Sequence, residues 1–213
     1  MPDLLRALRA FLYPFVCPAC GRSSSADLLC SSCAEQVRGA SPSAERPPGI
    51  DALVAPYRYE GVVRDLLIRF KYGSDRHPLS ALTALLCAAV DPAYLLRPDA
   101  VVPIPMSFWR SRRRGFNQAE LLGRAVADEL RIPLLPSALR RARRRPPQAS
   151  LDRAARLVNL QGGFRPGDGL FGRAVLLVDD VVTTGATLAE AARAARAGGA
   201  RRVSALVLAR AEA

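Results

Sequence analysis

Two neighbouring acidic residues and a group of hydroxyl side chains lie together in the C-terminal third of the chain. Asp179 and Asp180 directly follow Val175–Val178, and four consecutive aliphatic residues indicate a strand that is buried on both faces of a parallel sheet. A turn of threonines and one glycine comes next, and the Ala-rich segment 188–197 behind it is typical of a helix. An acidic pair at a strand end, a hydroxyl-rich turn and a helix start therefore follow one another directly.

Each part of this succession suits a phosphorylated sugar. Backbone N–H groups at a helix N-terminus attract anions, and hydroxyl groups add donors. We expect a phosphate group to bind at five residues: Thr183, Thr184, Gly185, Ala186 and Thr187. Asp179 and Asp180 are expected to accept hydrogen bonds from a ribose diol or from water on Mg²⁺. The alternative is a helix capped by one Asp, but two acidic residues before T-T-G-A-T favour the ligand site.

Four cysteines near the N-terminus have the spacing of a metal site. Cys17 and Cys20, then Cys30 and Cys33, form two C-x2-C pairs separated by nine residues. Such pairs supply the four thiolates that a tetrahedral zinc ion prefers. Disulfides are the alternative, but a cytoplasmic chain would not keep them. We predict a structural zinc ribbon that leaves no coordination position open and that needs its metal to fold.

Composition bounds the class of protein. The chain has 213 residues, of which 50% are hydrophobic, so it is expected to be globular. No apolar run is long enough to span a bilayer, and the N-terminal segment lacks the pattern of a signal peptide. We therefore expect a cytoplasmic protein. The net charge of +12 favours anionic ligands, including phosphates and nucleic acid.

Hydrophobic periodicity and Pro-rich stretches divide the chain into three parts. Residues 1–37 are expected to form a helix and the zinc ribbon, residues 38–50 a linker, and residues 51–213 an α/β domain. Within the domain we predict strands at 99–105, 132–135, 175–178 and 203–209, and helices at 62–70, 79–90, 117–130, 150–160 and 188–197. The segment 140–148 is rich in Arg and Pro and is predicted to be a mobile loop.

Two groups of basic residues are candidates for contacting a ligand. Lys71, the only lysine, lies near the end of a predicted helix, where it is either a favourable C-terminal charge or a ligand-facing cation. An Arg-rich segment follows the strand at 99–105, and ligands of parallel sheets bind at the carboxyl edge. Its guanidinium groups can clamp a pyrophosphate, the alternative being a solvated loop. The candidates are Arg110, Arg112, Arg113 and Arg114.

The motifs resemble a known family. V-L-L-V-D-D-V-V-T-T-G-A-T at 175–187 is similar to the signature of type I phosphoribosyltransferases, whose ligand is phosphoribosyl pyrophosphate (PRPP). Together with the four cysteines and R-R-R-G-F-N-Q-A-E-L-L at 112–122, it resembles the ComF family, which is linked to competence and DNA uptake. The resemblance covers nearly the whole chain.

The resemblance implies a type I phosphoribosyltransferase fold, an α/β domain with a mostly parallel sheet flanked by helices, behind a small four-cysteine zinc ribbon. It implies that Asp179 and Asp180 hold the ribose hydroxyls of PRPP, with Mg²⁺, and that residues 183–187 hold the 5-phosphate. Three functions are consistent with it. In the first, the chain binds PRPP and handles single-stranded DNA during natural transformation, with other DNA-uptake proteins. In the second, it is an active phosphoribosyltransferase. In the third, it is a PRPP-responsive regulator or scaffold. The residues identify no acceptor substrate.

Overall fold

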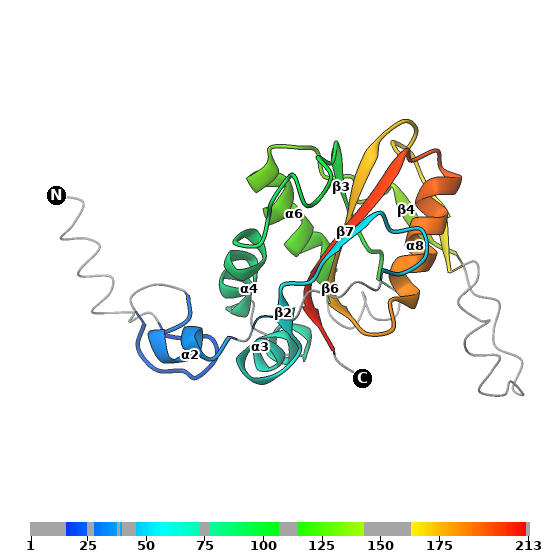
Figure 1. The fold of residues 1–213 in the computed structure, drawn as a ribbon. Coiled ribbons are helices and arrows are strands. Elements are labelled where there is room, and N and C mark those ends of the chain that lie inside the picture. Colours follow the sequence, from blue (N-terminus) through cyan, green and yellow to red (C-terminus); the bar gives the residue numbers. More distant parts are fainter. Residues whose placement is uncertain are drawn as a thin grey trace, which may run out of the picture.

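A parallel sheet with helices on both faces forms the body of the molecule, and a small N-terminal module lies beside it (Figure 1). The computed structural model describes residues 16–24, 28–37, 39, 46–72, 77–106, 115–142 and 163–211. This arrangement confirms the predicted α/β class with a mostly parallel sheet. None of the helices within the described ranges is both long and apolar enough to cross a membrane.

The strand order explains where the acidic pair lies. The five strands are β1 (Ala52–Val54), β2 (Tyr57–Arg58), β3 (Ala100–Pro103), β6 (Ala174–Val182) and β7 (Arg202–Arg210). They are arranged β1-β7-β6-β3, with β2 also beside β7, and every pair is parallel. The ladder between β3 and β6 ends where Pro103 pairs with Val178, whereas β6 continues beside β7 to Val182. Asp179 and Asp180 therefore lie just beyond the end of β3.

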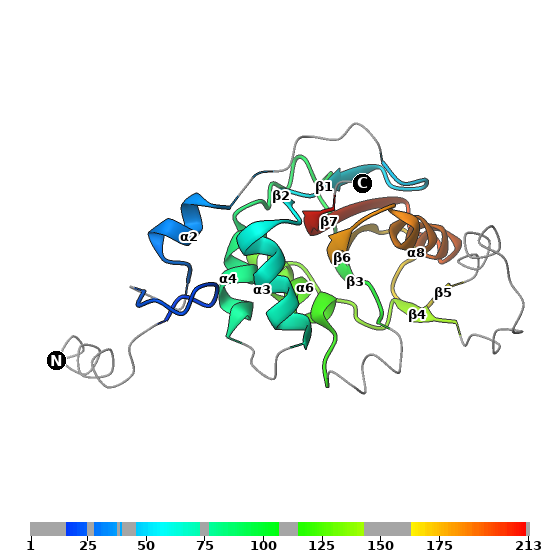
Figure 2. The same cartoon turned by 90° about the horizontal axis from the view of Figure 1, so that it is seen from below.

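Helices cover the two faces of the sheet unequally. Among the described helices, three pack on one face: α3 (Gly61–Tyr72), α4 (Pro78–Cys87) and α6 (Gln118–Leu130). The other face is covered by α8 (Ala186–Ala197), as Figure 2 shows. Alternate β6 residues divide between the two cores, with Leu176 and Val178 on the first face and Val175 and Leu177 on the second. This alternation is what a strand buried on both faces requires.

Local sequence accounts for the helix boundaries. Five apolar residues of α3 recur at helical spacing and are buried: Val62, Val63, Leu66, Leu67 and Phe70. Helix α6 begins after Asn117, whose side chain accepts a hydrogen bond from the backbone N–H of Ala119 at 3.2 Å. It ends at Leu130, and the residue that follows, Arg131, is left-handed with φ 54°.

The N-terminal module packs directly against the domain. It contains α2 (Ser31–Glu35) and an isolated bridge between Val16 and Ser23. The buried Cys17 and Cys33 belong to the same hydrophobic cluster as the core residues of α3. The following segment, residues 46–51, runs along α8 on the other side of the sheet, with Ile50 buried in the second core. The domain boundaries that the sequence predicts remain predictions.

The structure corrects three local predictions. The acidic pair lies within β6, because the long neighbour β7 keeps pairing past Val178. Arg140 and Arg141 belong to β4 (Leu139–Arg141), which pairs antiparallel with β5 (Phe164–Pro166), so this part of the predicted mobile loop is a strand. The predicted strand at 132–135 forms only one bridge, between Leu134 and Val101. The predicted N-terminal helix and the predicted helix at 150–160 lie outside the described residues.

Candidate functional site

The acidic pair meets the only lysine of the chain at the carboxyl edge of the sheet. Lys71, in the last turn of α3, places Nζ 2.9 Å from Oδ2 of Asp180. Both side chains are largely buried, with 16% and 14% of their surface exposed. Asp179 lies beside them, and its Oδ1 accepts a hydrogen bond from the backbone N–H of Asp180 at 2.9 Å. The structure thus brings together three of the residues that the sequence singled out.

The two carboxylates have different electrostatic environments. Burial, followed by the charge of Asp180, raises the pKa of Asp179 to about 7, although the Asp180 amide, Lys71 and Arg141 oppose the shift. A carboxyl group that titrates near neutral pH is held ionised when a cation or a set of hydroxyl donors approaches it. The pair is therefore suited to a divalent cation or a vicinal diol.

The hydroxyl-rich turn lies between β6 and α8, next to the acidic pair. Gly185 is the N-cap of α8 with φ 74°, a left-handed conformation that favours glycine. A Cβ atom on Gly185 would lie 2.5 Å from Cγ of Pro47, so the segment before β1 also demands a glycine here. Thr183 and Thr184 are exposed, and Oγ1 of Thr184 accepts a hydrogen bond from the N–H of Ala186 at 3.4 Å. All five predicted phosphate-binding residues lie in this turn or at the first residues of α8.

The Arg-rich segment begins and ends at the same edge. Ile104 continues from β3 and donates its N–H to Val178 O at 2.9 Å. Asn117, which begins α6, donates from Nδ2 to Ile104 O at 3.2 Å. The two flanks of this segment therefore meet beside the acidic pair. The four candidates Arg110, Arg112, Arg113 and Arg114 lie outside the described residues, and their role stays a prediction.

The four cysteines converge as their spacing predicts. The sulfur atoms of Cys17, Cys20, Cys30 and Cys33 all lie within 4.8 Å of one another. Those of Cys20 and Cys30 are 3.7 Å apart, and tetrahedral zinc with Zn–S bonds of about 2.3 Å separates its sulfur ligands by about 3.8 Å. The Ser32 hydroxyl and the Cys33 backbone lower the pKa of Cys30 to about 6. Four converging thiols, one of them readily ionised, fit a zinc ion.

Comparison with known proteins finds one matching domain family and several similar proteins. The phosphoribosyl transferase domain family matches residues 117–213, which include the acidic pair and the hydroxyl-rich turn. DNA utilization protein YhgH of Escherichia coli is 32% identical over 200 residues, covering 92% of this chain and 84% of that protein. Competence protein F of Haemophilus influenzae is 30% identical over 207 residues, covering 92% and 90%. The chain belongs to the ComF family. Competence protein ComFC of Bacillus subtilis is 29% identical over 183 residues, covering 84% and 70%.

Two residues near the candidate site were not singled out by sequence reasoning. Arg141 donates from Nε to Pro105 O at 3.2 Å, and its guanidinium lies 5.2 Å from the ring centre of Phe164. Its charge also opposes the rise in the pKa of Asp179. Gln118, in the first turn of α6, is 2% exposed, and its Nε2 has no hydrogen-bond partner among the described residues. Arg141 was hidden in an Arg-rich run, and only its pairing with β5 distinguishes it.

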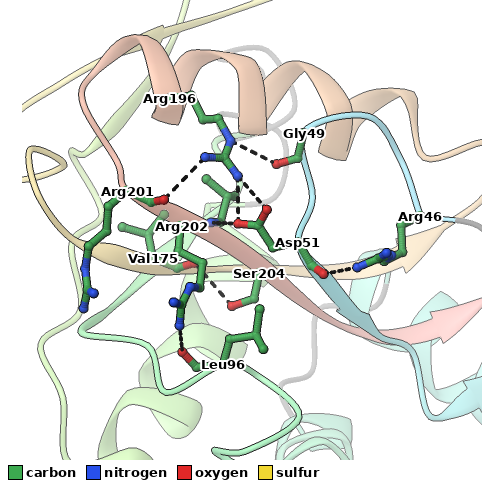
Figure 3. A network of polar contacts seen from close by, with 10 residues as sticks. Arg46, Gly49, Asp51, Leu96, Val175, Arg196, Arg201, Arg202 and Ser204 are labelled. Carbon is green, nitrogen blue, oxygen red and sulfur yellow. Dashed lines mark hydrogen bonds and ion pairs between the residues drawn. The ribbon is translucent and has the colours of Figure 1, made fainter.

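The amino edge of the ComF-family sheet also carries acidic residues, and protein groups pair with both Asp51 and Asp99. Figure 3 shows the contacts of Asp51. Arg196 donates two hydrogen bonds of 2.7 Å to Asp51, which also accepts the N–H of Val203 at 2.8 Å. Asp99 accepts the N–H of Ala174 at 2.7 Å and pairs with Arg201 at 3.0 Å. These carboxylates join strands and helices, and we assign them no ligand.

Proposed function

We propose that this chain binds PRPP with Mg²⁺ at the carboxyl edge of its sheet and acts in DNA uptake. One observation carries the proposal: the continuation of β6 past β3 places the acidic pair, with its lysine partner, directly before the turn at Gly185. A diol-binding or cation-binding group and an anion-binding helix start thereby lie within one short stretch of chain. PRPP carries both a diol and phosphate groups.

The parts of PRPP are assigned by chemistry. Asp179 and Asp180 accept hydrogen bonds from the ribose hydroxyls or from water on Mg²⁺. The 5-phosphate binds at residues 183–187, where the N-terminus of α8 points its N–H groups outward. The pyrophosphate, with its Mg²⁺, is assigned to the arginines of segment 110–114, whose flanks lie at this edge.

The proposed biological role rests on the relatives and on charge. Their names are competence protein F, competence protein ComFC and DNA utilization protein. A net charge of +12 suits a protein that handles single-stranded DNA. We further infer a cytoplasmic protein with zinc in its ribbon, because a reducing compartment keeps cysteine thiols available to a metal. Turnover of PRPP would need an acceptor, and no residue set assigns one, so binding is the function proposed.

Calorimetry with PRPP and Mg²⁺ tests the ligand site. We expect the wild-type protein to bind. The double variant Asp179→Asn with Asp180→Asn should keep its fold and lose at least about 100-fold in affinity, because it lacks the charge-assisted hydrogen bonds that the two carboxylates would accept. Asp168→Asn is the matched control, because that carboxylate is 97% exposed and lies outside the site. Equal affinity in the double variant and the wild type would refute the site.

A separate measurement tests the DNA role. The affinity for single-stranded oligonucleotides should fall steeply as salt rises, since neutralised phosphates release their counterions. Binding that does not change with salt concentration, or no binding at all, would contradict DNA handling by this chain. Either result would leave the proposal of PRPP binding unaffected.

A further inference from the structure

The last turn of α3 contacts the cysteine ribbon on one side. Nη1 of Arg69 donates a hydrogen bond to the backbone carbonyl of Pro18 at 2.9 Å. Pro18 lies between Cys17 and Cys20, within the first C-x2-C pair. The turn around it is closed by the N–H of Gly21, which donates to Cys17 O at 2.8 Å. Arg69 is thus bonded to the part of the ribbon whose shape a bound metal would fix.

The same helical turn contacts the acidic pair on its other side. Lys71 follows Arg69 by two residues, and residues two apart on an α-helix point about 200° away from each other. One turn therefore reaches the ribbon with Arg69 and the sheet edge with Lys71. Between them Phe70 is fully buried, in the cluster that also holds Cys17 and Val178. Ribbon, helix and acidic strand form one continuous packed unit (Figure 2).

The pairing of Lys71 with Asp180 connects this turn to the proposed ligand site. Lys71 pairs with Oδ2 of Asp180, and a carboxylate has a second oxygen that can accept a hydrogen bond from a ligand hydroxyl. A mostly buried ammonium group also balances part of the negative charge that two adjacent carboxylates bring to the site. Lys71 therefore holds Asp180 in place for the proposed ligand.

We propose that Arg69 is a positioning residue, through which the metal-loaded ribbon holds Lys71 against Asp180 and so sets the affinity for PRPP. This inference rests on the proposed PRPP binding and adds a connection from the ribbon to that site. When the metal leaves, the turn at Pro18 loses its constraint, Arg69 loses a fixed acceptor, and the end of α3 gains freedom. The state of the ribbon thereby changes the affinity for the ligand through Lys71. The opposing view is that the ribbon is an independent module with no effect on PRPP.

A thermodynamic cycle separates these views. PRPP affinity is measured by calorimetry for Arg69→Ala, for Lys71→Met, and for the two changes combined. We expect about a fivefold loss for Arg69→Ala and a larger loss, about tenfold, for Lys71→Met, within the usual range of coupling between sites. In the Lys71→Met background, Arg69→Ala should cost nothing further, because the residue on which it acts has gone. Arg69→Lys should retain most of the affinity, since an ammonium group can donate to the same carbonyl.

The metal itself is tested with Cys30→Ser combined with Cys33→Ser. We expect zinc to be lost, as measured by metal analysis, and PRPP affinity to fall about as far as in Arg69→Ala. Circular dichroism shows whether the domain is still folded. If this variant unfolds, Arg69→Ala decides the question, because it leaves all four cysteines in place. Arg64→Ala is the matched control on α3, since Arg64 is exposed and contacts only the neighbouring Asp65 among the ion pairs of the described residues.

The outcomes distinguish this inference from the proposed function. If the wild type does not bind PRPP, both fail together. If the wild type binds and the Arg69 and cysteine variants bind equally well, only the coupling is refuted. An Arg69→Ala loss that is just as large in the Lys71→Met background also refutes it, because the ribbon would then act by another route.

Discussion

Aspartates at the two edges of one sheet have opposite environments. At the amino edge, Asp51 and Asp99 each accept a hydrogen bond from a backbone N–H and pair with an arginine. The Ala174 amide and Arg201 lower the pKa of Asp99. At the carboxyl edge, burial and the charge of Asp180 raise the pKa of Asp179 to about 7. The same side chain is thus a satisfied structural link at one edge and an undercompensated group at the other.

The difference follows from the direction of the strands and helices. Helix α8 has its N-terminus at the carboxyl edge, beside the acidic pair, and its last turn at the amino edge, where Arg196 meets Asp51. A helix C-terminus favours cations and a helix N-terminus favours anions. Arginine therefore pairs with aspartate at the amino edge, whereas the helix N-terminus at the carboxyl edge favours anions. The carboxylates with fewer protein partners are those of the proposed ligand site.

The largest expected effect on stability is at the amino edge. Asp51→Ala removes both hydrogen bonds from Arg196 and leaves the N–H of Val203 without its acceptor. We expect a loss of about 3 kcal/mol in the free energy of unfolding, since bonds to charged groups and unsatisfied donors each contribute about 1–3 kcal/mol. Chemical denaturation measures it. PRPP affinity should stay unchanged, and a parallel loss of affinity would show that the two edges are not separate.

At the carboxyl edge the corresponding change should stabilise the protein. The folded state raises the pKa of Asp179 from 3.8 to about 7, so between these values ionisation favours the unfolded chain and stability falls as pH rises. Asp179→Asn removes this cost. We expect about 2 kcal/mol of added stability at pH 8, shrinking toward zero near pH 4. Thermal unfolding across this pH range is the measurement, and a gain independent of pH would exclude the electrostatic explanation.

Two glycines give a matched test of the two edges. Gly185 has φ 74°, and a Cβ atom on it would lie 2.5 Å from Pro47. Gly199 has φ 86°, and a Cβ atom on it would lie 2.6 Å from Phe171. Each change to Ala should cost about 1.5 kcal/mol of stability. Only Gly185→Ala should also weaken PRPP binding, by about tenfold, because it distorts the start of α8. Equal affinities of the two variants would argue against a phosphate at this turn.

The smallest expected effect is at Asp99. Its side chain is 42% exposed, so water and salt weaken its pairing with Arg201. Asp99→Asn should lower stability by about 0.5–1 kcal/mol at neutral pH. Because the fold lowers the pKa of this carboxyl, its contribution is present above the unfolded value and disappears as pH falls through the folded value. Denaturation at pH 7 and pH 3 checks this, and a larger difference at pH 3 would contradict it.

Sequence reasoning succeeded where the important neighbours are close in the chain. The acidic pair, the hydroxyl-rich turn and α8 follow one another directly, so their proximity is fixed by covalent connection. The convergence of the four cysteines was predictable because each C-x2-C pair brings its own two sulfur atoms together. The prediction of a loop at 140–148 was wrong for Arg140 and Arg141, since the strand that pairs with them begins at Phe164.

The sequence by itself thus determined the α/β class, the succession of acidic pair, hydroxyl-rich turn and helix, and the cysteine cluster. It left two interpretations of Lys71 open, and only the tertiary structure showed that its partner is Asp180. The fold likewise decided three other contacts: Arg69 with Pro18, Pro47 with Gly185, and Arg141 with Pro105. Each joins segments far apart in the chain, and such contacts exist only once the strand order and the helix layers have set which ends meet at one edge.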